Sequence, residues 1–461
     1  MCLASLVVLG GCRAGPDYHP QSSAELSVPA AYLHSAEAHA DMAGEADWWK
    51  RFDDPALPPL IARALAGNTD IASATARLQQ AREGLRQAKA QFAPTISSSG
   101  NAGRLFNSAA PDSDSFSQSL DARWTADLFG GLGRGRQASA ASLEAARYSL
   151  ADVQRAILAE LARNLVDTRT TALRLDIARD TLRTQDDNLV IAGFRVRAGL
   201  VSALDEEQAR SQRAATAASI PLLVRTEAAA RNRVAVLAGM APEAINPLLG
   251  TSSKVPAAPR LVVGAPLDLL RRRPDLRAAE RRLAAASARI GVAKAQLYPA
   301  LVLTGNLGTT SNSIRTLTDV VTGQIFASLS ATIFDGGRLR SVVRQRRAEA
   351  EESLADYHGR VLGALEDVEN ALVTRETSDT RLVELGQQVA AADAAARLAR
   401  SNYRAGLTDF RTLLDAERTL LSARDGEASA RGDRTKAAIQ LYLALGGDWP
   451  QDLDFSGKKR P

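Results

Sequence analysis

Polar and apolar residues alternate strictly along the segment from Phe116 to Phe129. Every second side chain is apolar, whereas the side chains between them are polar or charged, so the two kinds would occupy opposite faces of a β-strand. The apolar positions are Leu120, Ala122, Trp124, Ala126 and Leu128, and the polar ones are Ser119, Asp121, Arg123, Thr125 and Asp127. A strand of this length suits a tilted bilayer crossing, and a charged face suits a water-filled interior. A strand of a soluble sandwich remains the alternative.

The same alternation recurs about 205 residues later, which indicates an internal duplication. The corresponding apolar positions of the second copy are Ile325, Ala327, Leu329, Ala331 and Ile333, with Ser328, Ser330 and Thr332 on the opposite face. Other matches keep the same order: Ala88-Lys-Ala-Gln91 with Ala293-Lys-Ala-Gln296, and Arg197-Ala-Gly-Leu200 with Arg404-Ala-Gly-Leu407. A proline-rich segment separates the copies, and its prolines cannot continue a helix.

Each copy predicts a first helix, a pair of strands, a very long helix, a glycine-containing turn and a returning helix. The first helices cover Leu57–Phe92 and Leu267–Leu297, the long helices Arg136 to about Ala192 and Arg340 to about Asn402, and the returning helices start at Leu204 and Leu413. Apolar residues spaced by seven, such as Leu143, Leu150 and Ile157, predict a coiled-coil seam. Pro221 is expected to break the first returning helix. A soluble coiled-coil scaffold is the alternative interpretation of these helices.

Four strands per chain are too few for a closed membrane sheet, because the smallest membrane barrels need about eight. A sheet cannot leave its edges open in lipid, where no water satisfies the backbone. If the strands cross a membrane, several chains must therefore contribute to one barrel, and a trimer would supply twelve strands.

Both cysteines of the chain, Cys2 and Cys12, lie within its first dozen residues. The apolar run Leu3–Gly11 is too short to span a bilayer, and Leu9-Gly-Gly-Cys12 resembles a bacterial lipobox. We therefore expect residues 1–11 to be a signal peptide, truncated at its start since no Lys or Arg precedes the apolar run, and Cys12 to carry covalent lipid. An ordinary buried N-terminal segment with two unpaired thiols is the alternative.

Charge and residue usage argue against nucleic-acid binding and catalysis. The 57 Lys and Arg residues exceed the 52 Asp and Glu residues by five, but the two signs alternate along the helices, as on solvated helix faces. The four histidines have no metal-ligand spacing. The glycine-rich loop Gly130–Gly135 is followed by no Lys-Ser/Thr pair for a nucleotide phosphate, so an enzyme is a weak alternative.

The chain resembles the TolC-like outer-membrane factors, and among them the NodT-like lipoprotein subunits of resistance-nodulation-division (RND) efflux systems. The resemblance rests on an ordered set of motifs: Trp48–Leu57, Asn68–Ile71, Arg272–Asp275 with Ala279-Glu280, Ile290–Pro299, Phe334–Gly337 and Tyr403–Phe410. It implies an α+β membrane protein in which a trimeric twelve-stranded β-barrel continues into a long periplasmic coiled-coil barrel. The expected organisation is signal peptide 1–11, lipidated segment 12–56, first repeat 57–240, linker 241–266, second repeat 267–447 and tail 448–461.

The resemblance also implies the setting in which the chain works. It would be a homotrimeric exit duct, lipid-anchored in and spanning the bacterial outer membrane and extending into the periplasm. Its partners would be a periplasmic adaptor protein, an inner-membrane RND transporter and outer-membrane lipid. No catalytic residue and no cofactor besides the lipid on Cys12 is expected. The duct of a type I secretion system is the alternative.

Two groups of site residues follow from the resemblance. In that family the helical turns meet the adaptor, which assigns this contact to Gly199, Leu200, Gly406 and Leu407. The family also closes its tunnel with a ring of side chains near the turns, here Asp415 supported by Tyr403 and Arg418. Arg411 lies one turn before Asp415 and is expected to pair with it. Three copies of Asp415 would form a negative constriction that favours cations.

Overall fold

The computed structural model describes residues 14–34, 48–106, 108–109, 111–259, 266–267 and 272–447. Cys12, the signal peptide, part of the proline-rich linker and the tail 448–461 lie outside these residues. The chain divides into two compact units, each built from both repeats. Unit 1 comprises Met1–Leu26, Thr75–Ser149 and Asp275–Arg360, and unit 2 comprises Ser27–Ala74, Leu150–Pro274 and Val361–Pro461.

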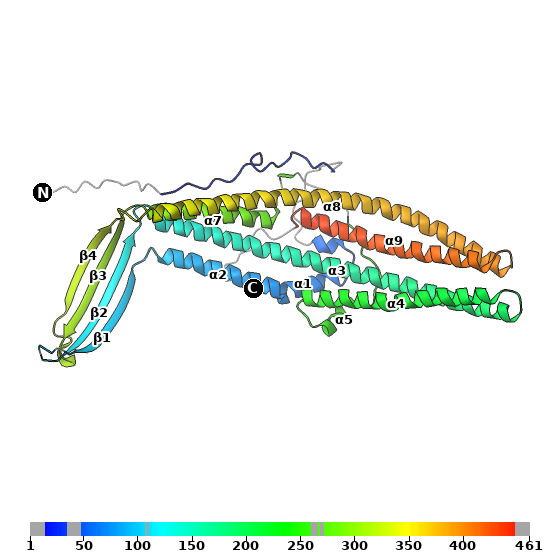
Figure 1. Cartoon of the computed structure of the whole chain (residues 1–461), viewed down its shortest axis with the longest axis horizontal. Helices are drawn as coiled ribbons and strands as arrows, with labels where there is room; N and C mark the ends of the chain where they lie inside the picture. Colours follow the sequence, from blue (N-terminus) through cyan, green and yellow to red (C-terminus); the bar gives the residue numbers. More distant parts are fainter. Residues whose placement is uncertain are drawn as a thin grey trace. The chain divides into compact units, whose positions relative to one another are not determined.

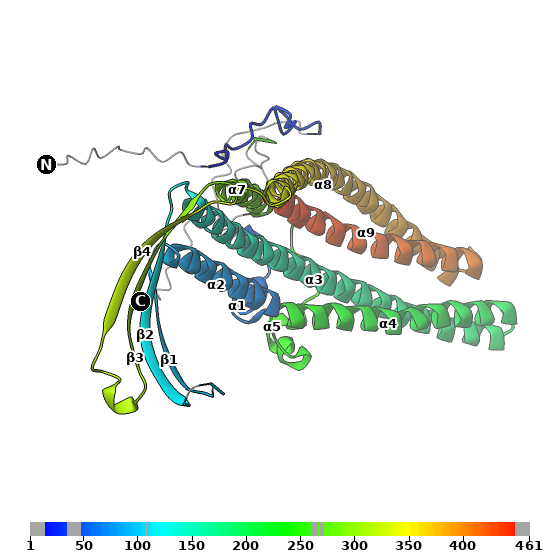
Figure 2. The same cartoon turned by 60° about the vertical axis from the view of Figure 1, so that its left-hand side comes forward.

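Four strands of unit 1 form one antiparallel sheet in chain order (Figure 1). They are β1 Thr95–Leu105, β2 Ser113–Ala126, β3 Ala300–Ser311 and β4 Thr322–Ser330. The two expected strand pairs are joined, since β2 of the first repeat pairs with β3 of the second from Phe116 opposite Ser311 to Ala126 opposite Leu301. Figure 2 shows that the sheet is strongly curved.

The sheet has one apolar face to which both repeats contribute, as the alternation predicted. Ala122 of β2 lies opposite Gly305 of β3, which in turn lies opposite Ile325 of β4. Directly paired residues point to the same side of a sheet. On the opposite face Asp121 accepts hydrogen bonds from Asn306 Nδ2 and from Ser119 Oγ, both at 2.7 Å.

Both predicted strand ends were placed too late in the sequence. The first strand stops at Ala126 because the Asp127 carboxylate accepts hydrogen bonds from the amides of Leu132 (3.0 Å) and Gly133 (2.7 Å), which starts the next helix. Asp335 does the same for the amides of Gly337 and Leu339 after β4. Each repeat thus uses a carboxylate to change from strand to helix.

The first predicted helix proved to be two. Helix α1, Leu57–Gly67, ends at Asn68, and α2 covers Thr69–Ala90. The Asn68 Oδ1 accepts hydrogen bonds from the amides of Asp70 and Ile71, and its Nδ2 donates to the Leu237 carbonyl. In the second repeat, the helix expected over Leu267–Leu297 is α7, Pro274–Ala295, which has proline at its first position.

The long helices extend further than predicted at both ends. Helix α3 runs from Gly131 to Arg197 and α8 from Arg338 to Arg404, and each begins in unit 1 and ends in unit 2. Their unit 2 portions pair with the returning helices α4, Ala203–Leu237, and α9, Phe410–Ala444 (Figure 1). Unit 2 also holds the short helices η1 Trp48–Arg51, η2 Pro242–Ile245 and α5 Asn246–Leu249, whereas η3 Ile314–Thr316 follows β3 in unit 1.

The expected break at Pro221 was wrong, because this proline lies inside a continuous α4. Its side chain is exposed, so the ring needs no room in a packed interface. Buried side chains on either side of it, including Thr216 and Val234, hold the helix in place. Packing therefore outweighs the one backbone hydrogen bond that proline removes.

None of the helices described in these ranges contains an apolar stretch long enough to cross a membrane.

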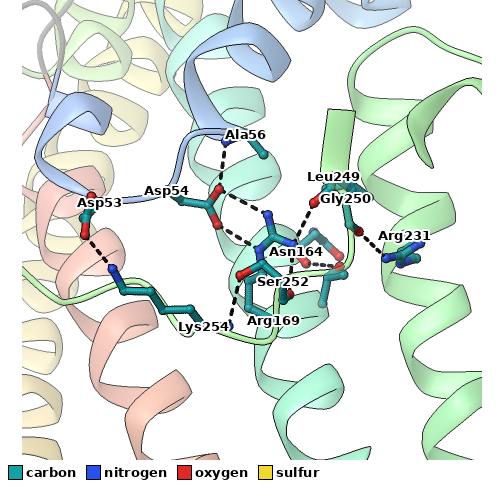
Figure 3. A network of polar contacts seen from close by, with 11 residues as sticks. Asp53, Asp54, Ala56, Asn164, Arg169, Arg231, Leu249, Gly250, Ser252 and Lys254 are labelled. Atoms are coloured by element: carbon teal, nitrogen blue, oxygen red, sulfur yellow. Dashed lines mark hydrogen bonds and ion pairs between the residues drawn. The ribbon is translucent and has the colours of Figure 1, made fainter. Parts of the chain in front are cut away.

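A buried arginine fixes the N-terminal segment and the linker of unit 2 to α3 (Figure 3). Arg169 is only 2% exposed, and its Nε and Nη2 donate to the two carboxylate oxygens of Asp54 at 2.8 and 3.2 Å. Its Nη1 donates to the carbonyls of Leu249 (2.8 Å) and Ser252 (3.0 Å). Four donated hydrogen bonds thus join three separate segments at one side chain.

Removal of the Asp54 carboxylate should strongly destabilise the protein, because Arg169 would remain buried with an unpaired charge. We expect Asp54→Ala to lower the free energy of unfolding by about 3–5 kcal/mol, measured by guanidinium unfolding of the detergent-solubilised protein. The matched control is Asp53→Ala, whose partner Lys254 is exposed, and which should change little. Equal stabilities of the two variants would contradict this role of Arg169.

Candidate functional site at the helical turns

The two helical turns in unit 2 have the same backbone hydrogen bonds. At the end of α3 the amide of Gly199 bonds to the Val196 carbonyl (3.0 Å), and that of Leu200 to the Arg195 carbonyl (2.9 Å). Gly406 and Leu407 repeat both bonds at the end of α8, with distances of 3.1 and 2.8 Å. This is the Schellman motif, in which the residue after the helix end is left-handed.

Glycine is required at these turns by backbone conformation, not by lack of space. Gly199 and Gly406 have φ angles of 69° and 73°. A Cβ atom at either position would meet no other atom within 4 Å, so only the left-handed backbone excludes larger residues. The duplication has therefore kept one turn design in both repeats.

Polar caps begin the helices that follow the turns. The Ser202 hydroxyl accepts a hydrogen bond from the Leu204 amide at the start of α4. At the start of α9 the Asp409 carboxylate accepts hydrogen bonds from the Thr412 hydroxyl and amide, which lower the pKa of Asp409. Both returning helices are thus fixed at their first turn.

Each turn presents an apolar side chain to solvent. Leu200 is 73% exposed and Leu407 is 77% exposed. In the first turn region, Phe194 is also exposed, and the Arg197 guanidinium lies 4.6 Å from the centre of its ring. The four residues assigned to adaptor contact are therefore found at two turns of matching geometry, both accessible to a partner.

Tyr403 lies in a small core behind the turns. Its ring is 5.3 Å from that of Phe410, and both side chains are buried. The Arg195 guanidinium of the first repeat lies 4.3 Å from the centre of the Tyr403 ring and donates to the Arg404 carbonyl at 3.2 Å. Tyr403 thus joins the two hairpins, whereas Asp415 and its arginines are exposed.

Asp415 lies between two arginines on the exposed side of α9. Its carboxylate is 3.9 Å from Arg411 Nε and 3.6 Å from Arg418 Nη1, and the Asp415 side chain is 58% exposed. Arg418 also donates to Gln212 Oε1 on α4, at 2.8 and 3.1 Å. The predicted pairing of Arg411 with Asp415 is present as a long, solvent-exposed contact.

The sequence analysis did not predict a buried carboxylate that lies two residues after Asp415 on α9. Glu417 is 5% exposed and accepts hydrogen bonds from Asn188 Nδ2 (2.7 Å) and Arg400 Nη2 (3.0 Å). The sequence did hold a signal, because Glu417 follows Phe410 by seven residues and so occupies a seam position of α9. This acid connects α9 with α3 and α8.

The glycine-rich loop that an enzyme would need for a phosphate is used otherwise. Two of its amides, those of Leu132 and Gly133, already donate to Asp127. Among the described residues, no group of three or more His, Cys, Asp and Glu side chains is placed to hold a metal ion.

Comparison with known proteins identifies the relatives of this chain. The family model described as outer membrane efflux protein matches residues 60–240 and 265–447. The chain is 32% identical to the pyoverdine export outer membrane protein OpmQ of Pseudomonas putida, over 93% of both sequences.

Solved structures agree with this relationship. The outer-membrane channel OprN has a TM-score of 0.87 at 36% identity, over 95% of this chain and all of that one. The Neisseria gonorrhoeae MtrE outer membrane channel, solved in an open state, has a TM-score of 0.85 at 26% identity, over 95% and 98%. The predicted α+β class, with long helices and four strands per chain, is confirmed. The chain therefore belongs to the outer membrane efflux protein family.

Proposed function

We propose that three copies of this chain form a passive exit duct through the outer membrane for a tripartite efflux pump. As an outer membrane efflux protein the chain is located in the outer membrane and extends into the periplasm. The proposal of a trimer rests on the two outer strands of the sheet, β1 and β4. All of their residues are exposed in the single chain.

The strand order supports closure by identical copies. The sheet has an even number of strands and every neighbouring pair is antiparallel, so β1 and β4 run in opposite directions. The β4 strand of one copy can then pair with β1 of the next and continue the antiparallel pattern. Three copies of four strands give a closed barrel of twelve, which leaves no backbone group unpaired in lipid.

The two faces of the sheet support the orientation of the barrel. The face with Leu120, Ala122, Ile325 and Leu329 meets lipid, and the face with Asp121, Arg123 and Asn306 lines a water-filled interior. The barrel is passive, since energy for export comes from the inner-membrane RND transporter. A periplasmic adaptor connects the two and docks on the exposed Leu200 and Leu407.

The gate of the duct is a ring of three copies of Asp415. The exposed position of this carboxylate on α9, near the turn, supports its place in a constriction. Arg411 and Arg418 neutralise part of its charge, so they reduce the preference for cations that three carboxylates alone would give. The three side chains therefore act together on conductance and selectivity.

The gate is tested by conductance of the purified protein in planar bilayers. Asp415→Ala should raise conductance, because it removes the ion pairs of Asp415 with Arg411 and Arg418 in the constriction. It should also lower cation selectivity, because it removes the negative charge of the ring. Arg411→Ala should instead raise cation selectivity, since it leaves Asp415 less neutralised. Selectivity that both variants leave unchanged would remove these residues from the constriction, and no conductance from folded trimers would refute the duct.

We also propose that Cys12 carries the lipid anchor at the foot of the barrel. Two residues after it, the Ala14 amide donates to the Phe129 carbonyl at 3.1 Å, just beyond β2. The buried Arg134 donates from Nε to the Ala14 carbonyl (3.1 Å) and from Nη2 to the Gly15 carbonyl (3.3 Å). The start of the described chain is thus held beside the end of β2, which supports a membrane anchor just before it.

Metabolic labelling with palmitate tests the anchor. We expect label on the wild-type protein and on Cys2→Ser, and none on Cys12→Ser, because a thiol at the lipobox position is required for acylation. Label on Cys12→Ser, or none on wild-type protein that is folded in the outer membrane, would contradict this assignment.

A further inference from the structure

The apolar face of the sheet has a hollow of about 410 Å³. Its floor is formed where two small residues are paired across β2 and β3, namely Ala122 and Gly305. Larger apolar side chains from all four strands surround it: Ile96, Leu120, Leu307 and Ile325. These four are all exposed in the chain. The hollow is thus a depression in a surface that is otherwise raised by branched side chains.

A chain of contacts connects the apolar face of the sheet, at Trp124, with an exposed cationic group, Arg136. Trp124 follows Ala122 on the same face, and its Nε1 donates to the Phe92 carbonyl at 2.9 Å. The ring of Phe92 lies 5.9 Å from the guanidinium of Arg136. Arg136 is exposed in the second turn of α3.

The depth of the hollow places it in one leaflet. Ala122 lies four residues before the end of β2 at Ala126, which is about 13 Å along the strand and roughly 10 Å along the membrane normal for a strand tilted by about 40°. Half of the hydrocarbon layer is about 15 Å thick. The hollow therefore lies within the leaflet next to the strand ends, from which the chain continues into the helices. Under the proposed barrel this is the periplasmic leaflet, which consists of glycerophospholipids.

We propose that each chain binds one glycerophospholipid of the periplasmic leaflet at this site. One acyl chain fills the hollow over Ala122 and Gly305, and the phosphate bonds to the Arg136 guanidinium. Acyl hydrocarbon matches the apolar wall, and a guanidinium is the side chain best suited to a phosphate. This inference rests on the proposed orientation of the barrel, and it adds a specific ligand to a surface that would otherwise meet only bulk lipid.

The test compares two glycine variants that differ in their place on the same face. Gly305→Leu fills the hollow, whereas Gly100→Leu adds the same side chain four residue pairs away from the Ile96–Ala122 pair, toward the other end of the sheet. At both positions a Cβ atom has its nearest neighbours at 3.9 Å, so neither variant should disturb folding. Arg136→Gln replaces the charged guanidinium that would bind the phosphate with a shorter, uncharged amide.

Native mass spectrometry of full-length protein, extracted from outer membranes in mild detergent, counts the retained phospholipids. We expect up to three on wild-type and Gly100→Leu trimers, and none on Gly305→Leu. Titration with dioleoyl phosphatidylglycerol should give about tenfold or more weaker binding to Arg136→Gln, the change expected for loss of a charged hydrogen bond.

Three outcomes would overturn the site. Equal retention by Gly305→Leu and Gly100→Leu would mean that lipid covers the face without a specific site. Wild-type trimers that retain no lipid would mean that the hollow binds none. A lipopolysaccharide mass on the trimer would place the hollow in the other leaflet. The same spectra report assembly separately, because a chain that remains monomeric would refute the proposed duct whether or not lipid is bound.

Discussion

The structure depends on one constraint, which is that every backbone amide and carbonyl in the hydrocarbon layer needs a hydrogen-bond partner. Within one chain, β2 and β3 meet this requirement on both sides, whereas β1 and β4 each meet it on one side only. The missing partners can come only from other chains in the membrane. Trimerisation is therefore proposed as a condition for placing this sheet in lipid.

The duplication makes this constraint easier to satisfy. Each repeat provides a strand pair, and Asp127 and Asp335 perform the same capping task where strand changes to helix. The turns at Gly199 and Gly406 likewise share one hydrogen-bond pattern. The repeats differ behind the turns, since Tyr403 and Phe410 of the second repeat form the buried core onto which Arg195 of the first one packs. Six similar turns around a trimer would thus present two alternating surfaces to a partner.

Local patterns in the sequence predicted the elements well, and tertiary contacts explain where they failed. Alternation placed Leu120, Ala122 and Ile325 on one face, and the register bears this out, because strand periodicity depends on the backbone alone. Contacts between distant segments join the two strand pairs through β2 and β3. Such contacts also keep α4 continuous across Pro221. The buried Glu417 and the Arg169–Asp54 network were missed for the same reason, since burial of a charge becomes visible only when its partners are placed. The gate and adaptor residues came from the resemblance and stay predictions.

Disulfide cross-linking between the outer strands tests whether β4 of one copy pairs with β1 of the next. Cysteine replaces Ser97 or Ser99 of β1 together with Gln324 or Ser328 of β4, all on the polar face of the sheet. Within one chain these strands are separated by two others, roughly 14 Å, so a disulfide can form only between chains. We expect at least one combination to give covalently closed trimers on non-reducing gels of outer membranes. Monomers for every combination, from protein that is folded in the outer membrane, would contradict this pairing.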